Sequence, residues 1–276
     1  MAGAEVESRI TELKELQRVA YWLAHRFWSE ANAGNISVRL TDLPADVVQR
    51  EGCPPVQMPI AFPELAGRHF LVTGTGKRMR DVIHDLEGNI GLIRILPGGE
   101  AYTCVWGVPR VTSEFPAHSA IHEMLLAERP DHKAVVHTHP PGLAALTHLA
   151  QFRDAEALSD VLFRMHPETS YFLCRQLAYL PYMVPGSVEL GRATAGVLRT
   201  CKATLWDKHG VVAIGETMSR ALDWIEILEK AAQIYWLVAS SGQRPVGLTD
   251  QQIEAMLEAY GLAWKGGDPG EISPGR

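Results

Sequence analysis

The sequence predicts an α/β fold in which a mostly antiparallel sheet is covered by helices. Segments with apolar residues at three- and four-residue steps alternate with short apolar runs that have the period of a strand. Several of these runs come in pairs joined by short turns, as in hairpins. The chain has 276 residues, of which 46% are hydrophobic and 21% charged, the composition of an ordinary globular protein. We therefore predict a single domain over residues 1–276.

The helices are predicted from apolar periodicity and from the residues at their ends. The first covers residues 6–29, where apolar side chains recur on one face before an Asn/Gly turn. Thr112 or Ser113 is the expected N-cap of the second helix, and Thr217 the expected cap of a long later one. Further helices are predicted at 115–128, 141–165, 185–199, 217–240 and 249–260.

The strands are predicted where apolar or alternating runs lie between turn residues. Residues 41–68 are rich in Pro and Gly and poorly periodic, so we expect an insert-like excursion with some local structure. The Gly/Pro-rich tail from Gly266 is expected to be flexible. Strands are predicted at 36–40, at 69–73, twice within 88–106 around the turn at 97–99, and at 134–136, 203–206 and 211–214.

Charge and composition argue against several classes of protein. The net charge is −6 and basic residues form no stripe, so we expect no nucleic-acid partner. No apolar run reaches the ~20 residues of a membrane helix, and no signal peptide is visible at the start. We expect a cytoplasmic protein whose cysteines are reduced, because none forms a Cys-x-x-Cys pair. The cysteines are Cys53, Cys104, Cys174 and Cys201.

Histidines suggest a metal site. His137 and His139 follow an apolar strand, and residues i and i+2 of a strand point to the same side. His209 lies between two predicted strands and would complete the three protein ligands typical of a catalytic zinc. Taken alone, the pair of His137 and His139 is explained equally well by ordinary hydrogen bonds, and His209 alone is better explained as a hydrogen-bonded core histidine. His118 and His122, four residues apart on a predicted helix, form a rival metal pair without the glutamate of a His-Glu-x-x-His motif.

Three clusters of Gly, Asn, Thr and Ser have the character of anion-binding turns. They are Asn32–Ser37, Thr73–Lys77 and Thr112–Ser113, the last at the start of a predicted helix, where backbone N–H groups are free. Glu114 in the first helical turn interacts favourably with the helix dipole. Each cluster alone is explained by turn chemistry. Together with a possible metal site they favour a phosphorylated substrate.

The order of these motifs resembles the class II aldolase and adducin family, and within it the fuculose- and rhamnulose-phosphate type. The resemblance to the rhamnulose-phosphate branch covers nearly the whole chain, including extra residues around 44–68 and 84–106. Ala31 and Ala33 stand where that branch carries arginine and glycine. The motifs that carry the resemblance are Trp28–Glu30, Ala33–Arg39, Thr73–Asp81, Thr112–His118, His137–His139, Pro167–Thr169 and Trp206–Gly210.

The resemblance implies a three-layer αβα fold and zinc-dependent retro-aldol cleavage of L-rhamnulose 1-phosphate to dihydroxyacetone phosphate and L-lactaldehyde. It implies one zinc per subunit, held by His137, His139 and His209. Glu114 would be a fourth ligand in the resting enzyme and then the acid/base, and Glu168 a second proton-transfer group. Active sites would lie at subunit contacts of a C4 homotetramer. The positions that match a phosphate cradle are Asn32, Gly34, Asn35, Thr75, Gly76, Thr112 and Ser113.

Other functions on the same fold remain open from the sequence. The nearest alternatives are another ketose-phosphate aldolase, a dehydratase or an epimerase, because the same metal chemistry serves all of them. A non-catalytic adducin-like module is a further alternative. The intact set of His137, His139, His209 and Glu114 argues against such a module. A purely structural zinc is disfavoured because such sites are usually rich in cysteine, and none lies beside these histidines.

Overall fold

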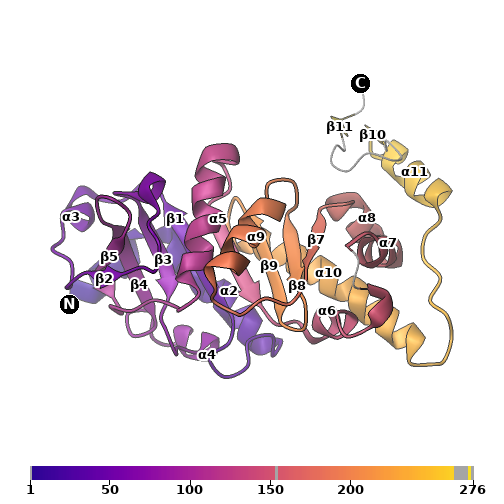
Figure 1. Ribbon diagram of the computed structural model, residues 1–276, viewed down its shortest axis with the longest axis horizontal. Helices are drawn as coiled ribbons and strands as arrows, with labels where there is room; N and C mark the ends of the chain where they lie inside the picture. Colours follow the sequence, from indigo (N-terminus) through magenta and orange to yellow (C-terminus); the bar gives the residue numbers. More distant parts are fainter. Residues whose placement is uncertain (1, 153–154, 264–272, 275–276) are drawn as a thin grey trace.

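A computed structural model describes residues 2–152, 155–263 and 273–274 of the chain. Its strands are β1 (Asn35–Leu40), β2 (Val56–Gln57), β3 (His69–Thr73), β4 (Ile90–Ile95), β5 (Ala101–Gly107), β6 (Ala134–Thr138), β7 (Leu177–Leu180), β8 (Ala203–Trp206) and β9 (Gly210–Gly215). Within the described residues these nine strands form one mixed sheet in the order β2-β5-β4-β3-β1-β6-β9-β8-β7 (Figure 1). Its neighbouring strands pair antiparallel except β7 and β8, which are parallel.

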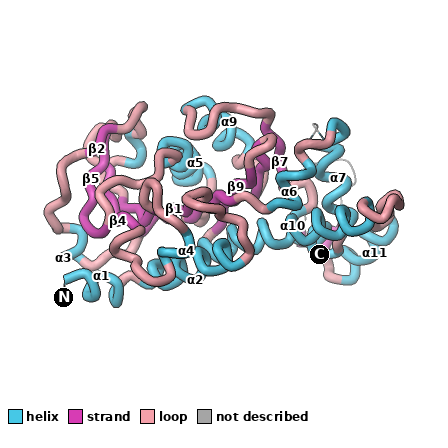
Figure 2. The backbone as a smooth tube through the Cα atoms, turned by 90° about the horizontal axis from the view of Figure 1, so that it is seen from below, coloured by secondary structure: helices cyan, strands magenta, loops and turns pink. Residues whose placement is uncertain are grey.

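Helices cover both faces of this sheet. Figure 2 shows α2, α4 and α10 along one face, and α5 and α9 along the other. No described helix has both the length and the apolar character that crossing a bilayer requires. The helices are α1 (Ala2–Arg9), α2 (Thr11–His25), α3 (Ala45–Val48), α4 (Met79–Val82), α5 (Phe115–Glu128), α6 (Pro141–Leu146), α7 (Ala155–Met165), α8 (Pro167–Leu173), α9 (Val188–Val197), α10 (Met218–Ala239) and α11 (Asp250–Ala259).

Strand β6 shows why the central strands are apolar throughout. Successive side chains of a strand point to opposite faces. Ala134 and Val136 pack in the core cluster that contains α2 and α10, whereas Val135 packs in the cluster of α5 and α9. All three are fully buried, and burying each of the two valines stabilises the fold by roughly 1.5–3 kcal/mol. Burial on both faces therefore makes β6 a rigid support for the residues that follow it.

The prediction of one helix over residues 6–29 is wrong at two points. Ile10 leaves the helical conformation, with φ −109° and ψ 103°, and separates α1 from α2. At the other end α2 stops at His25. Phe27 takes the left-handed conformation with φ 56°, which ends a helix although glycine usually fills that position. The turn toward β1 therefore begins several residues earlier than predicted.

The prediction for residues 141–165 is also wrong, because α6 ends at Leu146 and α7 begins at Ala155. A short 3₁₀ turn at Ala150–Phe152 lies between them, and residues 153–154 lie outside the described part. Neither α8 nor β7 was predicted. The four residues of β7 do not alternate between apolar and polar, since three of them are buried as the strand packs at the sheet edge.

The N-cap predicted for α5 is wrong, although the helix begins at Phe115 as expected. Its N-cap is Glu114, which makes no capping side-chain bond. The hydroxyl of Thr112 instead accepts the backbone N–H of Glu114 at 3.3 Å, a local turn just before the helix. The cap predicted for α10 is confirmed, because the side chain of Thr217 accepts the backbone N–H of Arg220. The carboxylate of Glu114 is consequently free to face the interior.

Residues 41–68 contain α3, the edge strand β2 and a 3₁₀ turn at Pro63–Leu65. The tail predicted from Gly266 lies outside the described residues except for β11 (Ser273–Pro274). That short strand pairs with β10 (Leu262–Ala263).

Candidate functional site

The strand register gathers the predicted site at one edge of the sheet. Neighbouring antiparallel strands place the start of β1 beside the end of β6, and the end of β6 beside the start of β9. Asn35 is paired with His137, and His137 with Val212. His139 follows β6 directly, and His209 directly precedes β9. Residues from three separate parts of the sequence therefore meet.

The three histidines form a group whose ligand nitrogens all lie within 4.8 Å of one another. His137 is buried, and His139 and His209 are half-buried. The ring centroids of His137 and His209 are 4.9 Å apart, and those of His139 and His209 are 5.0 Å apart. The Nε2 atoms of His137 and His139 approach to 3.2 Å. Spacing of this kind suits a single shared ion.

Contacts of the outer ring nitrogens fix how two of these rings can bind a cation. The carbonyl oxygen of Val211 can only accept, so His137 donates from Nδ1 at 3.0 Å. His139 likewise donates from Nδ1 to the carboxylate of Glu30 at 2.9 Å. With Nδ1 turned outward in each ring, the two Nε2 atoms face each other at 3.2 Å, where one cation could be bound by both. These residues fit a metal ion.

The third histidine adds an unpaired atom to the same place. The Nδ1 atom of His209 is buried and has no hydrogen-bond partner among the described residues. Burial lowers the pKa of His209 to about 4, and it lowers the pKa of His137 well below its usual range. Both rings are therefore neutral near pH 7, the form in which imidazole binds a metal.

Gly210 makes room for the histidines to converge. A Cβ atom there would lie 2.5 Å from the carbonyl oxygen of Thr138, 2.7 Å from Cδ2 of His139 and 3.2 Å from Cε1 of His137. The first two distances are shorter than real contacts, and one of the atoms belongs to backbone fixed in the sheet. A glycine at this position is therefore a requirement of the site.

Glu114 faces the same group from the start of α5. Its Oε2 atom lies 3.6 Å from Nε2 of His137 and accepts a hydrogen bond of 2.8 Å from the amide of Asn35. The side chain is 14% exposed. Burial raises the pKa of Glu114, while the Asn35 hydrogen bond and the charge of His139 act in the opposite direction. A half-desolvated carboxylate beside three imidazoles can serve as a ligand or as a proton acceptor.

Two of the three predicted anion-binding clusters are joined beside Asn35. The backbone N–H of Thr75 donates to the carbonyl of Arg110 at 3.1 Å, and that of Thr112 donates to Thr73 at 2.8 Å. The hydroxyl of Thr73 also accepts the N–H of Ile36 at 3.1 Å. The strand ends of β1 and β3 and the segment before α5 thus form one surface. Thr75, Gly76 and Ser113 are exposed on it.

The third cluster forms the turn that leads into β1. Gly34 has φ +74°, and a Cβ there would lie 2.7 Å from Oγ of Ser29 and 3.0 Å from the carbonyl oxygen of His137. Its backbone thus passes directly against the metal-site strand. Asn32 is exposed at the tip of the turn. Ala31, on the same turn, takes the left-handed conformation with φ 49°.

Comparisons with known proteins identify the family of the chain. Residues 14–236 match the family described as "Class II Aldolase and Adducin N-terminal domain". The chain belongs to this family. It is 36% identical to the rhamnulose-1-phosphate aldolase of Bacteroides thetaiotaomicron over 254 residues, which cover 91% of this chain and 94% of that protein. It is 31% identical to the rhamnulose-1-phosphate aldolase of Listeria monocytogenes over 92% of this chain and 95% of the relative.

A solved structure of this family gives the same result for the fold. The sugar-phosphate aldolase from Thermotoga maritima is 41% identical and superposes with a TM-score of 0.76. The match covers 86% of this chain and 98% of that one. The chain is thus similar to class II aldolases in sequence and in backbone. An L-fuculose 1-phosphate aldolase, 21% identical with a TM-score of 0.58, shares the fold.

Glu168 is the one predicted catalytic residue that this class II aldolase chain does not bring to the histidines. It lies on α8, is 52% exposed, and its carboxylate pairs with Nδ1 of His166 at 3.0 Å. Among the described residues, no hydrogen bond or ion pair joins it to Glu114 or to the metal-site histidines.

The rival pair His118 and His122 is buried, and both rings contact the hydroxyl of Ser37. Ser37 lies 2.7 Å from Nδ1 of His118 and 2.7 Å from Nε2 of His122. The two rings are 1% and 0% exposed, so no open coordination position faces solvent. Hydrogen bonding within the core therefore explains this pair.

Sequence reasoning missed two carboxylates that support the site. Glu30, on the turn before β1, orients His139. Glu229 is 1% exposed on α10, and its carboxylate accepts the backbone N–H groups of Gly142 at 3.0 Å and Leu143 at 2.8 Å. It thereby holds the first turn of α6, which begins two residues after His139. The signal that could have revealed Glu229 is a charged residue on the apolar face of α10.

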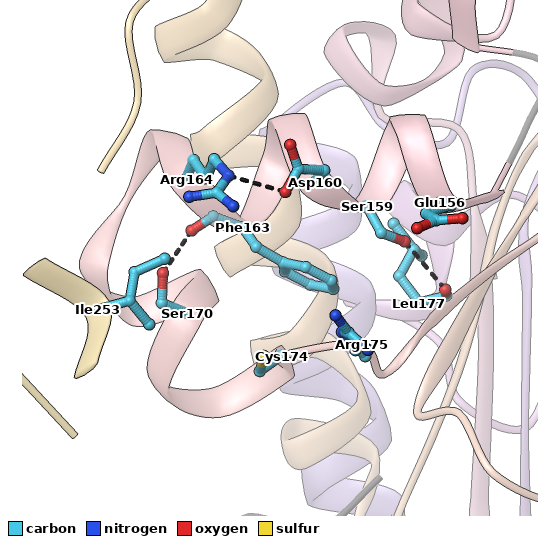
Figure 3. A pocket seen from close by; sticks show the side chains of 10 residues that line it. All are labelled: Glu156, Ser159, Asp160, Phe163, Arg164, Ser170, Cys174, Arg175, Leu177 and Ile253. Atoms are coloured by element: carbon cyan, nitrogen blue, oxygen red, sulfur yellow. Dashed lines mark hydrogen bonds and ion pairs between the residues drawn. The ribbon is translucent and has the colours of Figure 1, made fainter. Parts of the chain in front are cut away.

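A separate cavity of about 400 Å³ lies between α7, α8 and α11, lined by residues distinct from the metal site (Figure 3). Its polar groups are largely engaged with each other and with the backbone. Arg164 pairs with Asp160 at 2.7 Å and with Asp250 at 2.6 Å, and Ser159 donates to the carbonyl of Leu177 at 3.3 Å. The cavity therefore lacks the converging free groups of a catalytic centre.

Proposed function

We propose that this chain is a zinc-dependent rhamnulose-1-phosphate aldolase, which cleaves L-rhamnulose 1-phosphate to dihydroxyacetone phosphate and L-lactaldehyde in the breakdown of rhamnose. The observation that carries the proposal is the meeting of His137, His139 and His209 with the carboxylate of Glu114. Curated relatives named for this reaction match more than nine tenths of the chain. A lyase of this class needs charge stabilisation, an acid/base group and a phosphate site.

The three histidines and Glu114 would hold one zinc ion per chain. Three nitrogen ligands and one carboxylate are a donor set typical of catalytic zinc. When bound, the ion supplies Lewis acidity for the negative charge that develops on the dihydroxyacetone phosphate fragment. Neutral imidazoles, oriented by Val211 and Glu30, leave that charge undiminished, whereas thiolate ligands would reduce it.

We assign the proton transfer to Glu114. Cleavage removes the proton of the C4 hydroxyl, breaks the C3–C4 bond and delivers a proton to C3 of the dihydroxyacetone phosphate fragment. A carboxylate with a burial-raised pKa is a better base than an exposed one. The amide of Asn35 holds this carboxylate in a fixed direction from the side of β1.

The exposed turns beside Asn35 would bind the phosphate. Thr75 and Gly76 lie on one side and Thr112 and Ser113 on the other, and hydrogen bonds between the two segments keep them together. Backbone N–H groups and hydroxyls are suited to phosphate oxygens. We assign Asn32 and Gly34, on the neighbouring turn, to the same site.

Glu168 is proposed to transfer a proton at the aldehyde end from a neighbouring copy of the chain. In one chain it is engaged with His166 and apart from the histidine group. An arrangement of four copies with active sites at their contacts would bring it to the site of a neighbour. Phe27 is 86% exposed, and an exposed aromatic ring is suited to a contact between subunits. It lies close to the histidine group, because the carbonyl of the next residue, Trp28, accepts hydrogen bonds from Thr138 and from the backbone N–H of His139.

A product assay tests the proposal. Zinc-loaded protein is incubated with L-rhamnulose 1-phosphate and, in parallel, with L-fuculose 1-phosphate, and released dihydroxyacetone phosphate is measured with a coupled dehydrogenase. We expect equal amounts of dihydroxyacetone phosphate and L-lactaldehyde, faster from the rhamnulose ester. His209→Ala is the matched control and should lack this release. Conversion to a product that keeps all six carbons would contradict the aldolase function and indicate an epimerase or dehydratase.

A further inference from the structure

A chain of hydrogen bonds runs from the apolar core to Glu114. Asn35 and Ser37 are alternate residues of β1 and face the same side, toward α5. His118 and His122 lie one turn apart on α5. The Oγ atom of Ser37 is 2.7 Å from both rings, and Nε2 of His118 is 2.5 Å from Oδ1 of Asn35.

The donor and acceptor of every hydrogen bond in this series follow from the group at its end, the carboxylate of Glu114. An ionised carboxylate only accepts, so Asn35 must donate to Glu114 from Nδ2. The amide oxygen of Asn35 then faces His118, which must donate from Nε2. The remaining Nδ1 of His118 is an acceptor, so the hydroxyl of Ser37 donates to it. Ser37 in turn accepts from Nε2 of His122.

Burial makes this direction the only favourable one. Ser37 and His122 are 0% exposed, His118 is 1% exposed and Asn35 is 5% exposed, so water does not offer alternative partners. Reversing the Asn35 amide would set its oxygen against the Glu114 carboxylate. Burial lowers the pKa of His118 to about 3, so this ring stays neutral and keeps one donor and one acceptor. Hydrogen-bond chains in a low-dielectric interior reinforce one another.

The inner end of the chain is anchored in the core. The ring of His122 packs 4.8 Å from that of Phe70, and its Nδ1 atom has no hydrogen-bond partner among the described residues. The series therefore begins at a fixed, neutral histidine and ends at Glu114. The hydrogen bonds of His118 and His122 go to Ser37 and Asn35, so neither ring is a ligand in the proposed metal site.

We propose that His122, Ser37 and His118 form a positioning relay that fixes the Asn35 amide as a donor to Glu114 and so aims the acid/base carboxylate. The relay rests on the proposed function of Glu114. It makes the two histidines positioning residues, which touch neither substrate nor metal. Outer partners of this kind typically contribute 10–100-fold to activity, because they hold the reacting group in its productive direction.

The first test is the proton position on the two rings. Zinc-loaded protein with ¹⁵N-labelled histidine is studied by solid-state NMR, and the signals are assigned with His118→Gln and His122→Gln. We expect both rings to be neutral with the proton on Nε2 throughout the pH range of activity. A proton on Nδ1 of His118 would overturn the relay. Nε2 would then carry no proton to donate to the amide oxygen of Asn35, and Nδ1 could no longer accept from Ser37.

The second test compares two buried serines. Ser37→Ala interrupts the relay, and we expect kcat to fall about 10- to 100-fold while KM changes less than kcat. Ser119→Ala is the matched control, because Ser119 is equally buried on α5 and its hydroxyl has no partner among the described residues. Its kcat should stay within about twofold of the unmodified protein. Assays are run well below the melting temperature of each variant. Equal losses in both variants, or an unchanged kcat for Ser37→Ala, would overturn the relay.

The two tests separate the relay from the proposed function. If the unmodified protein releases no dihydroxyacetone phosphate, the proposed reaction is wrong, and the histidine spectra alone decide whether the hydrogen bonds run toward Glu114. If the reaction is present and Ser37→Ala behaves like Ser119→Ala, the reaction stands and the relay is wrong.

Discussion

Replacing Gly210 by alanine is expected to weaken zinc binding about 100-fold and to remove most activity at limiting zinc. The added Cβ would lie 2.5 Å from the Thr138 carbonyl oxygen and 2.7 Å from the His139 ring. Either β9 must move away from β6, or the ring of His139 must turn, and both separate the nitrogen ligands. Zinc affinity measured by competition with a chromophoric chelator, together with kcat/KM, checks this outcome.

Gly196→Ala is the matched control for this substitution. Gly196 lies in α9, and a Cβ there would meet nothing within 4 Å. Alanine in a helix is favoured over glycine by roughly 0.5–1 kcal/mol, so this variant should be as active and slightly more stable. Gly210→Ala should lose about 1–3 kcal/mol of unfolding free energy through overpacking. Unchanged zinc affinity in Gly210→Ala would mean that the three rings do not meet as described.

Glu114→Gln is expected to lower kcat by about 10²–10⁴-fold, the usual contribution of a general acid/base. Glutamine keeps the size of the side chain and an oxygen that accepts from Asn35, but it cannot take up a proton at neutral pH. Because three histidines remain, the variant should still bind zinc, more weakly than the unmodified protein. Steady-state kinetics and metal analysis of the same preparation measure both effects.

Glu128→Gln serves as the control on the same helix. Glu128 is on the surface at the far end of α5 and pairs with Arg199 at 3.1 Å, with 44% of its side chain exposed. Exposed ion pairs contribute little, so its kcat should change by less than about twofold. If Glu114→Gln kept a comparable kcat at saturating zinc, another group would have to be the acid/base.

The convergence of His137 and His139 could be predicted from sequence because strand geometry alone sets part of their arrangement. His137 and His139 are two residues apart at the end of an apolar strand, and that spacing places both rings on one side. His209 required the sheet order, since β6 and β9 are adjacent although more than 70 residues separate them. The local sequence could suggest His209 as a candidate. Only the pairing of β6 with β9 shows that it lies beside His137 and His139.

The supporting contacts could not be predicted for the same reason. Glu30 meets His139 because Phe27 ends α2 early in a left-handed conformation, and no glycine or proline marks that point in the sequence. The sequence assigns Ser37 to a strand and to an anion-binding cluster, and it suggests His118 and His122 as a possible metal pair. Their hydrogen bonds depend on how α5 lies across β1, which neither segment specifies alone.

Errors in the fold had local causes. Ile10 breaks the first helix while its side chain remains buried, so the apolar period continues across the break. Strand β7 is four residues long and pairs parallel with β8, a connection made through α9. A run that short carries too little periodicity to be distinguished from a loop or a helix end.

Stepwise addition of zinc to metal-free protein, with dihydroxyacetone phosphate release from L-rhamnulose 1-phosphate followed at each point, tests the central claim most directly. We predict that activity is absent without metal, rises in proportion to added zinc and saturates at one ion per chain. His209→Ala, titrated in parallel, should stay near the baseline at the same zinc concentrations. Full activity of the metal-free protein in the presence of a chelator would contradict a metal-dependent aldolase centred on the three histidines.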